Sequence, residues 1–476
     1  MLPDAASTTQ SVRSAPLRLS AAILAVTVAV LGVTLTPSRA SVEEAPPEGP
    51  NVLLIITDDQ RDGEPSMRVM PQTTHLFGEQ GTEFSNAYAT TPLCCPSRAS
   101  IFTGQYAHNH RVVNNQRDLS HHERTWQRHL DEAGYETALY GKYLNSWMDR
   151  KPRAPIPYFD QSWQGYGEQN EKNPLESEDF LARRAIGFLE RAQDDDARPW
   201  AMVISTRSPH SPYAYPDRFN RDVGQFRPRP SVRDDLSDKP PYVRQTARKR
   251  RRQIRAGRRR HSARSIYTGQ LRELLAVDEM VGRVFERLRS LEEEQNTLAI
   301  FVSDNGHFWG EHSLPSKQFP YREAVEVPLY VRWPGRVAAG AIDRRLVANI
   351  DLAPTIMGAA GVAPGYRPDG RSLLDPGWRR RWMLLEGPSG RWQSYLGRNK
   401  QYIRWATGFR EYYDLRRDPF QEHNALAPRA DLANHRGRPV GRQSKVTVHR
   451  SAARRKAASM HAALNRVAHC AGRACP

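Results

Sequence analysis

The chain has 476 residues, which is enough for one large α/β domain and a smaller second domain. Its apolar content of 39% is typical of a globular protein with a hydrophobic core and excludes a chain that lacks one. Lysine and arginine total 70 against 52 acidic residues, giving a formal charge of +18. This charge favours polyanionic partners such as nucleic acid, anionic lipid or sulfated polysaccharide, and it carries no information about the fold.

The N-terminal segment has the pattern of an export signal. Two arginines precede an apolar run over residues 19–35, and small residues at Ser38 and Ala40 fit a signal-peptidase site. We therefore predict a signal peptide over residues 1–40, a linker over 41–50 and a secreted or extracytoplasmic protein. The run is almost long enough to span a bilayer, so an uncleaved N-terminal anchor is the alternative. No second run of this kind follows, and no stable membrane span is expected after cleavage.

Four unbroken apolar runs of strand length come next along the chain. They cover residues 51–57, 137–140, 200–205 and 297–303. Such runs are typical of strands buried on both faces of a parallel sheet. Amphipathic helices lie between them, the clearest with apolar residues at helical spacing over 271–288. This alternation predicts a doubly wound α/β sheet.

Polar residues follow each of these predicted strands. Ligands of open α/β sheets bind at the carboxyl ends of the strands, so we expect the four groups to meet at one edge. Asp and Gly are also ordinary turn residues, but four such strand ends together favour a site. The residues are Asp58 and Asp59, Gly141 and Lys142, Ser208 to His210, and Asp304 to Gly306.

The C-terminal part has a weaker pattern and scattered basic residues. Short strands are predicted around residues 382–386 and 395–405, with a terminal helix over 452–468. We therefore predict a catalytic α/β domain over 51–375 and a small α+β domain over 376–476.

Four cysteines form two sequence pairs. Cys470 and Cys475 either close a small disulfide loop, as an oxidising compartment favours, or remain free thiols. Cys94 and Cys95 are adjacent, and vicinal disulfides are strained and rare, so this pair needs another explanation.

The segment around Cys94 has the pattern of a helix start. Pro96 fits the first turn of a helix and Gly104 its C-terminal stop. Cys94 is then expected just before a helix N-terminus, where partial positive charge favours a bound anion. A buried loop thiol is the structural alternative, but it leaves Arg98 and the acidic strand ends unexplained.

The run Cys94-x-Pro96-Ser97-Arg98 resembles the signature of the formylglycine-dependent sulfatases, in which a separate formylglycine-generating enzyme oxidises the first cysteine. Pro and Arg must stand two and four residues downstream, so the register selects Cys94 rather than Cys95. An ordered series of further motifs extends the resemblance from Asn51 to Cys475. These motifs are Thr57-Asp58-Asp59-Gln60, Thr103-Gly104-Gln105-Tyr106, Gly141-Lys142-Tyr143, Ser303-Asp304-Asn305-Gly306, Val327-Pro328-Leu329, Asp351 to Thr355, Tyr413-Asp414-Leu415 and Asp418-Pro419.

Within this family the chain looks closest to the N-acetylglucosamine-6-sulfatases and the related heparan endosulfatases. The resemblance implies an alkaline-phosphatase-like fold, with a large mixed sheet flanked by helices and a smaller C-terminal α+β domain. It also implies hydrolysis of a sulfate monoester, on a 6-O-sulfated N-acetylglucosamine of a glycosaminoglycan-type glycan, through a formylglycine–sulfate intermediate. The motifs that resemble those of this group of sulfatases are His108 to Asn115, Lys142 to Asn145, Pro209 to Pro212 and His312 to Lys317.

The resemblance further implies a metal ion and a set of cations at the site. The metal, Ca²⁺ or alternatively Mg²⁺, is expected on Asp58, Asp59, Asp304, Asn305 and the formylglycine made from Cys94, an all-oxygen set that suits these hard cations. Arg98, Lys142 and Lys317 are expected to neutralise the sulfate. His210, which alone is more often a surface or core histidine, is the expected general acid for the leaving alcohol.

One position departs from the family pattern. Many sulfatases carry a histidine two residues after the lysine that corresponds to Lys142, and this chain has Leu144 there. The base that assists release of sulfate is therefore open between Asn145, His108, His110 and a water molecule.

A basic insertion is predicted over residues 244–264, with eleven lysines or arginines and no acid. It is either a solvated helix face or a docking surface for a sulfated glycan. Nucleic acid would also be attracted, but no aromatic-interleaved module or zinc motif supports that function, and no nucleic-acid partner is expected.

Two other functions remain open from the sequence. Phosphonate and phosphate monoester hydrolases share this scaffold and can share formylglycine, and a fold does not fix a substrate. An exported, non-catalytic polyanion-binding protein is the second, although the chain keeps each expected metal and sulfate residue except the second histidine.

Overall fold

The structure is a computed structural model, which describes residues 49–150, 154–165, 177–194, 198–258, 262–427 and 450–476. The predicted signal peptide over 1–40 and most of the predicted linker lie outside these ranges. Across the described residues, none of the helices has the length and apolar character that a membrane span requires.

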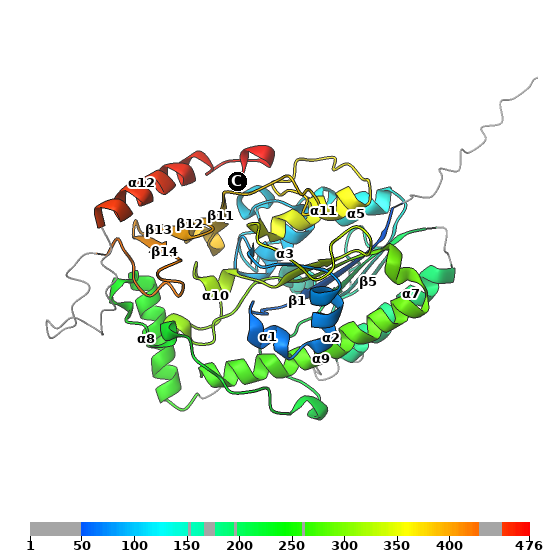
Figure 1. Cartoon of the computed structure of the whole chain (residues 1–476), viewed down its shortest axis with the longest axis horizontal. Helices are drawn as coiled ribbons and strands as arrows, with labels where there is room; N and C mark the ends of the chain where they lie inside the picture. Colours follow the sequence, from blue (N-terminus) through cyan, green and yellow to red (C-terminus); the bar gives the residue numbers. More distant parts are fainter. Residues whose placement is uncertain (1–48, 151–153, 166–176, 195–197, 259–261, 428–449) are drawn as a thin grey trace, which may run out of the picture. The chain divides into compact units, whose positions relative to one another are not determined.

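A mixed sheet forms the centre of the described structure (Figure 1). Four adjacent strands of this sheet run parallel, and a fifth joins them antiparallel. The parallel strands are β4 (Glu136–Gly141), β6 (Trp200–Ser205), β1 (Asn51–Thr57) and β7 (Thr297–Ser303), and β8 (Leu329–Arg332) pairs antiparallel with β7. The four predicted strands are thus confirmed, and β4 is longer than its prediction by one residue at each end. Within the described residues the order of the sheet is β5 (Gln161–Trp163), β4 (Glu136–Gly141), β6 (Trp200–Ser205), β1 (Asn51–Thr57), β7 (Thr297–Ser303), β8 (Leu329–Arg332), β2 (Thr82–Phe84) and β9 (Ala341–Asp343).

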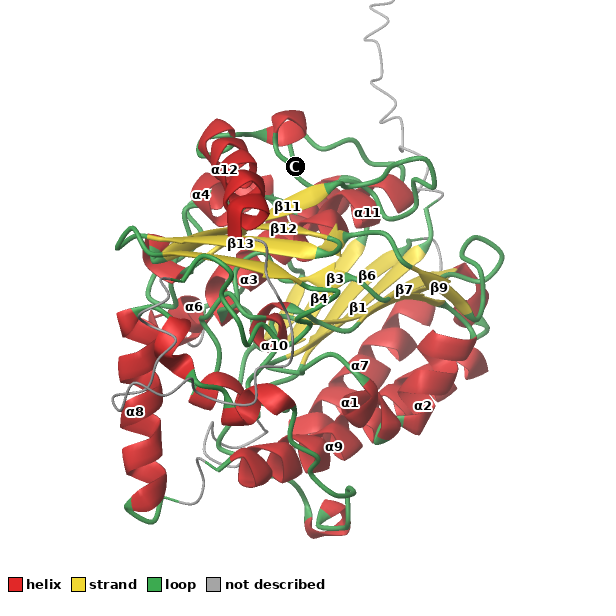
Figure 2. Cartoon of the chain, turned by 60° about the vertical axis from the view of Figure 1, so that its left-hand side comes forward, coloured by secondary structure: helices red, strands yellow, loops and turns green. Residues whose placement is uncertain are grey.

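Helices cover both faces of this sheet, which explains why its central strands are apolar throughout (Figure 2). In β1, the side chains of Val52, Leu54 and Ile56 join the core on one face, while those of Leu53 and Ile55 join the core on the other. The first face packs against α3 (Cys94–Thr103), α5 (Trp126–Glu132) and α11 (Leu352–Ala359), and the second against α7 (Ser177–Asp194) and α9 (Ala263–Ser290). The shorter helices are α1 (Glu64–Arg68), α2 (Pro71–Thr73), α4 (Ala107–His110), α6 (Asn145–Arg150) and α10 (Arg322–Val325).

The apolar positions predicted over residues 271–288 all lie within α9. Leu271, Leu274, Val281 and Leu288 are each 1% exposed or less, so the predicted amphipathic helix is confirmed. The doubly wound arrangement, the alkaline-phosphatase-like mixed sheet and the flanking helices are confirmed with it.

A second, antiparallel sheet is built from the C-terminal part, with α12 (Arg450–Arg466) packed against it. The predicted strand at 382–386 and the terminal helix are confirmed, the helix two residues nearer the N-terminus than expected. The element predicted over 395–405 is a hairpin of two strands. The four strands of this sheet are β11 (Trp382–Glu386), β12 (Trp392–Gly397), β13 (Lys400–Trp405) and β14 (Arg410–Asp414). Elsewhere, the short strands β3 (Ala87–Tyr88) and β10 (Val347–Ala348) pair with each other in a separate two-stranded sheet.

The C-terminal end is closed by the disulfide between Cys470 and Cys475, which confirms the first of the two alternatives for these cysteines. The backbone oxygen of Cys470 accepts hydrogen bonds from Asn109 and His108 at 2.9 and 3.0 Å. The chain end is therefore held against α4. The exact residue at which the second domain begins, predicted as 376, stays a prediction.

Candidate active site

The first element of the site is the start of α3. Leu93 has extended backbone angles, Cys94 is the first helical residue, and Gly104 ends the helix in the left-handed region with φ 65°. This angle favours glycine, and a Cβ at Gly104 would also lie close to Pro354, at 3.1 Å. Cys94 was expected one residue outside the helix; it lies inside, and its fully buried side chain sits at the positive end of the helix dipole.

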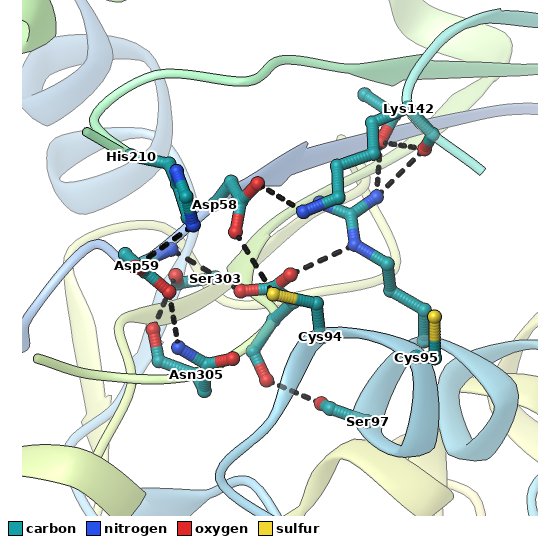
Figure 3. Close-up of polar contacts among 12 residues, drawn as sticks. Asp58, Asp59, Cys94, Cys95, Ser97, Lys142, His210, Ser303 and Asn305 are labelled. Carbon is teal, nitrogen blue, oxygen red and sulfur yellow. Dashed lines mark hydrogen bonds and ion pairs between the residues drawn. The ribbon is translucent and has the colours of Figure 1, made fainter. Parts of the chain in front are cut away.

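Carboxylates from two adjacent strands meet in front of Cys94 (Figure 3). The parallel pairing of β1 with β7 places Thr57 opposite Ser303, so the residues that follow each strand lie side by side. Oxygens of Asp58, Asp59 and Asp304 all lie within 4.8 Å of one another. The Sγ of Cys94 lies 3.5 Å from Oδ1 of Asp58. Two of the four strand ends that the sequence predicted to converge, those of β1 and β7, therefore do so.

This group of oxygens fits a hard divalent cation. Asn305 donates from Nδ2 to Oδ1 of Asp59 at 2.6 Å, and its buried Oδ1 has no hydrogen-bond partner in the described structure. Three carboxylates and an unsatisfied amide oxygen form the donor set that Ca²⁺ and Mg²⁺ prefer. Burial raises the pKa of Asp58, but Lys142, His210 and Lys317 outweigh it and hold that pKa well below its usual range.

Three buried cations surround the carboxylates. Arg98 donates from Nε to Oδ2 of Asp304 at 2.8 Å and from Nη1 to the backbone oxygen of Lys142 at 2.7 Å. The Nζ of Lys142 pairs with Asp58, and the Nζ of Lys317 pairs with Asp59. Lys317 also lies 3.1 Å from Sγ of Cys94.

The charges of these groups have a direct consequence for what the site binds. Three carboxylates balance three cations, so a divalent cation bound among them leaves a surplus of two positive charges. Arg98 keeps its buried Nη2 without a partner in the described structure, so one donor remains available to a ligand. The site is therefore suited to an anionic group beside Cys94.

His210 comes from the loop after β6 and reaches the same site. Its side chain is 33% exposed, and Nε2 lies 3.8 Å from Oδ2 of Asp59. Nδ1 lies 2.5 Å from the backbone oxygen of Ser211, which can only accept a hydrogen bond. Nδ1 therefore keeps its hydrogen, and Nε2 is the ring atom that exchanges a proton on the side of the site.

Comparison with known proteins matches residues 50–362 to the model of the family described as Sulfatase. The chain belongs to the sulfatase family. It is 32% identical over 364 residues to the human N-acetylglucosamine-6-sulfatase, covering 68% of this chain and 64% of that protein. It is 31% identical over 358 residues to the extracellular sulfatase SULF-1 homolog of Drosophila melanogaster, covering 68% of this chain and 31% of that protein. The chain thus spans less than two thirds of the length of either relative.

Solved structures support the fold. One is that of BT4656 in complex with its substrate D-glucosamine-2-N,6-O-disulfate, with a TM-score of 0.70 and 21% identity over 87% of this chain and 98% of that one. Another is the phosphonate monoester hydrolase of Silicibacter pomeroyi, with a TM-score of 0.68 and 21% identity over 88% of this chain and 95% of that one. Proteins of different substrate class thus share this sulfatase scaffold.

The side chains that were candidates for the base that assists release of sulfate lie in different surroundings. Leu144 is fully buried, and Asn145 contacts Cys95 rather than Cys94, with its backbone N–H 3.1 Å from Sγ of Cys95. His108 bonds Glu386 and the backbone of Cys470, while His110 bonds Ser100 and the N–H of Val112. Both nitrogens of each ring are therefore engaged away from Cys94.

The structure adds residues that sequence reasoning missed. His307 is buried, and burial, with Lys317 and His210 nearby, lowers its pKa to about 4 although Asp59 acts in the opposite direction. It lies one residue beyond the Asp304 to Gly306 motif, so its position after a predicted strand could have identified it as a candidate site residue. Gln270 donates from Nε2 to the backbone oxygens of Asp59 and Pro209, and no motif marked this residue within an amphipathic helix.

Proposed function

We propose that this protein is a secreted or extracytoplasmic sulfatase that releases sulfate from 6-O-sulfated N-acetylglucosamine in a glycosaminoglycan-type glycan. The observation that carries the proposal is the position of Cys94, whose Sγ lies 3.5 Å from Asp58 and 3.1 Å from Lys317 at the start of α3. A cysteine placed between a carboxylate group and a cation, in a sulfatase chain, fits the residue that is converted to formylglycine.

Cys94 and a metal ion would supply the reactive groups. Once a formylglycine-generating enzyme has oxidised Cys94, the hydrated aldehyde provides a hydroxyl nucleophile and a second hydroxyl whose deprotonation releases the sulfate. The residues that would hold the metal are Asp58, Asp59, Asp304, Asn305 and the modified Cys94. A bound Ca²⁺ or Mg²⁺ there would polarise sulfate oxygens and lower the pKa of the attacking hydroxyl.

The protein's own cations would position the sulfate group. Lys317 lies beside Cys94, and the Nη2 of Arg98, which has no partner in the described structure, would provide a second donor. Lys142 pairs with Asp58, and it would be free to turn toward sulfate if that carboxylate held a metal. Buried donors of this kind stabilise charge that builds on the sulfuryl oxygens in the transition state.

His210 is our candidate for protonating the leaving alcohol through Nε2, and the leaving group tests it. His210→Gln should lower kcat on N-acetylglucosamine-6-sulfate by about 10²- to 10⁴-fold, since a sugar alkoxide leaves poorly without a proton. On 4-nitrophenyl sulfate the loss should be much smaller, because nitrophenolate is stable as an anion. Steady-state kcat on both substrates checks this, and equal losses on the two would remove His210 from the role of general acid.

The substrate class comes from the relatives. The human protein at 32% identity is an N-acetylglucosamine-6-sulfatase, and the Drosophila relative is an extracellular sulfatase. Their names support a 6-O-sulfated glucosamine substrate and a location outside the cytoplasm, in line with the signal peptide predicted over residues 1–40.

Sulfate release from N-acetylglucosamine-6-sulfate tests the proposal. The protein used should carry formylglycine at position 94, established from the mass of the peptide that contains it. We expect sulfate to be released in proportion to the converted fraction. An aryl phosphonate serves as the competing substrate. Faster turnover of the phosphonate than of each sulfate ester tested would replace the proposal with a phosphonate monoester hydrolase, and no turnover of either would favour a non-catalytic polyanion-binding protein.

A further inference from the structure

The basic insertion predicted over 244–264 overlaps the helix α8 (Pro241–Arg255), which is attached to the protein by one face. Val243, Ala247 and Arg250 are buried, at 0%, 1% and 4% exposure. Their spacing of four and three residues places them on the same side of the helix. The opposite side of α8 is therefore turned to solvent.

The outer face of α8, defined here as Arg248, Lys249, Arg252 and Arg255, carries positive charge alone. All four side chains are exposed, and the helix contains no acidic residue. None of the four forms an ion pair with any residue that the structure describes. Among the described residues, the outer face is thus an uncompensated cationic surface.

Helix stability does not explain this concentration of charge. Arg248 and Arg252 stand four residues apart, a spacing at which like charges destabilise a helix. The helix dipole favours cations in the last turn, so it accounts for Arg252 and Arg255. It does not account for Arg248 and Lys249, which lie in the middle of the helix. A bound anion would offset the repulsion among all four.

The outer face also borders a hollow in the surface. This hollow has a volume of about 620 Å³, and three of the four outer-face residues line it. Figure 2 shows α8 at one side of the molecule, apart from the helices that cover the main sheet. The full lining is Gln245, Arg248, Lys249, Arg252, Gln253, Ala256 and Arg258.

Two exposed residues on the flanks of α8 contact the segment that carries Lys317. Arg251 donates from Nε to Oγ of Ser313 at 2.9 Å, four residues before Lys317. The ring of Tyr242 stacks on that of Phe319, two residues after it, at 5.6 Å. Two points of α8 thus contact the segment that places the ammonium of Lys317 3.1 Å from Cys94, so this segment links the helix to the candidate active site.

We infer that the outer face of α8 binds a sulfated glycan chain while one sulfate ester of the same chain lies at Cys94. This inference rests on the proposed function, because it assigns the anions to the substrate itself. Arginine forks bind the oxygens of sulfate groups in charge-assisted pairs.

Two triple variants of the full chain test this inference. Arg248→Gln, Lys249→Gln and Arg252→Gln together remove three charges and keep good helix formers. The matched control is Arg454→Gln, Arg455→Gln and Lys456→Gln on α12, three exposed residues whose replacement changes the net charge equally. The measurements are kcat and KM on heparin and on N-acetylglucosamine-6-sulfate, and heparin binding over a salt series. Circular dichroism establishes that both variants are folded.

The α8 variant should raise KM on heparin by about tenfold, as three screened charge contacts together imply. Its KM on N-acetylglucosamine-6-sulfate should stay at the wild-type value, because the monosaccharide does not reach α8. The slope of log affinity against log salt for heparin should fall by about two to three, if counterion release resembles that of nucleic acids. The α12 variant should behave as the wild type.

Equal effects of the two triple variants, or unchanged heparin binding by the α8 variant, would overturn the inference. A larger loss of affinity for duplex DNA than for heparin would assign the face to nucleic acid instead. If the wild-type protein released no sulfate from any ester, the proposed function would fail by itself, whereas the heparin-binding comparison would still decide the role of α8.

Discussion

Replacing Cys94 by alanine should reduce sulfate release to background, a loss of at least about 10⁴-fold in kcat, as when the nucleophile of a covalent mechanism is removed. Alanine has no group that can be oxidised to an aldehyde. The remaining cations and carboxylates should still bind sulfate, so the affinity for N-acetylglucosamine-6-sulfate should change far less than kcat. The assay is sulfate release from N-acetylglucosamine-6-sulfate by purified full-length protein.

The adjacent cysteine provides a matched control. Cys95 is buried like Cys94 and belongs to the same turn of α3, but its Sγ accepts a hydrogen bond from the N–H of Asn145 rather than contacting Asp58. Cys95→Ser keeps an acceptor at that position and should retain most of the activity. Equal losses in Cys94→Ala and Cys95→Ser would point to disruption of α3. Full activity of Cys94→Ala would remove formylglycine from the proposed function.

The main sheet was predictable because its central strands are apolar on both sides. Asn51–Thr57 and Thr297–Ser303 read as buried strands from their composition, and both have these bounds in the structure. The hairpin over 392–405 was harder to predict from the sequence. Its turn, at Arg398 and Asn399, interrupts a run of large residues without a proline or a paired glycine, so one element was predicted where two strands pair.

The candidate site was predictable where strand ends and motifs carry it. Asp58 and Asp304 follow parallel strands in register, and this rule alone brings them together. The contacts that hold the site depend on packing between distant segments. Gln270 contacts Asp59 from the N-terminal third of α9, 211 positions along the chain, and a glutamine among core leucines gives no sign of such a partner. Likewise, the absence of a partner for Asn305 Oδ1 is visible only in the assembled structure.

Removal of divalent metal with a chelator should abolish sulfate release and lower the thermal stability of the protein. Asp58, Asp59 and Asp304 have oxygens within 4.8 Å of one another and could hold a divalent cation, and a ligand at one hundred times its Kd stabilises the folded state by about 2.7 kcal/mol. Adding back Ca²⁺ or Mg²⁺ should restore both activity and melting temperature. Thermal unfolding followed with and without each ion measures the effect without relying on turnover.

A pair of aspartate variants separates this site from general effects of charge. Asp304→Asn keeps the shape of the side chain and removes one proposed ligand, so it should lose the metal-dependent rise in melting temperature together with activity. Asp62→Asn removes a carboxyl three residues beyond Asp59 and outside the oxygen cluster, and it should keep both. A metal-dependent rise of equal size in the wild type and in Asp304→Asn would place the ion elsewhere. If only Asp304→Asn loses the rise, the carboxyl ends of β1 and β7 hold the metal beside Cys94.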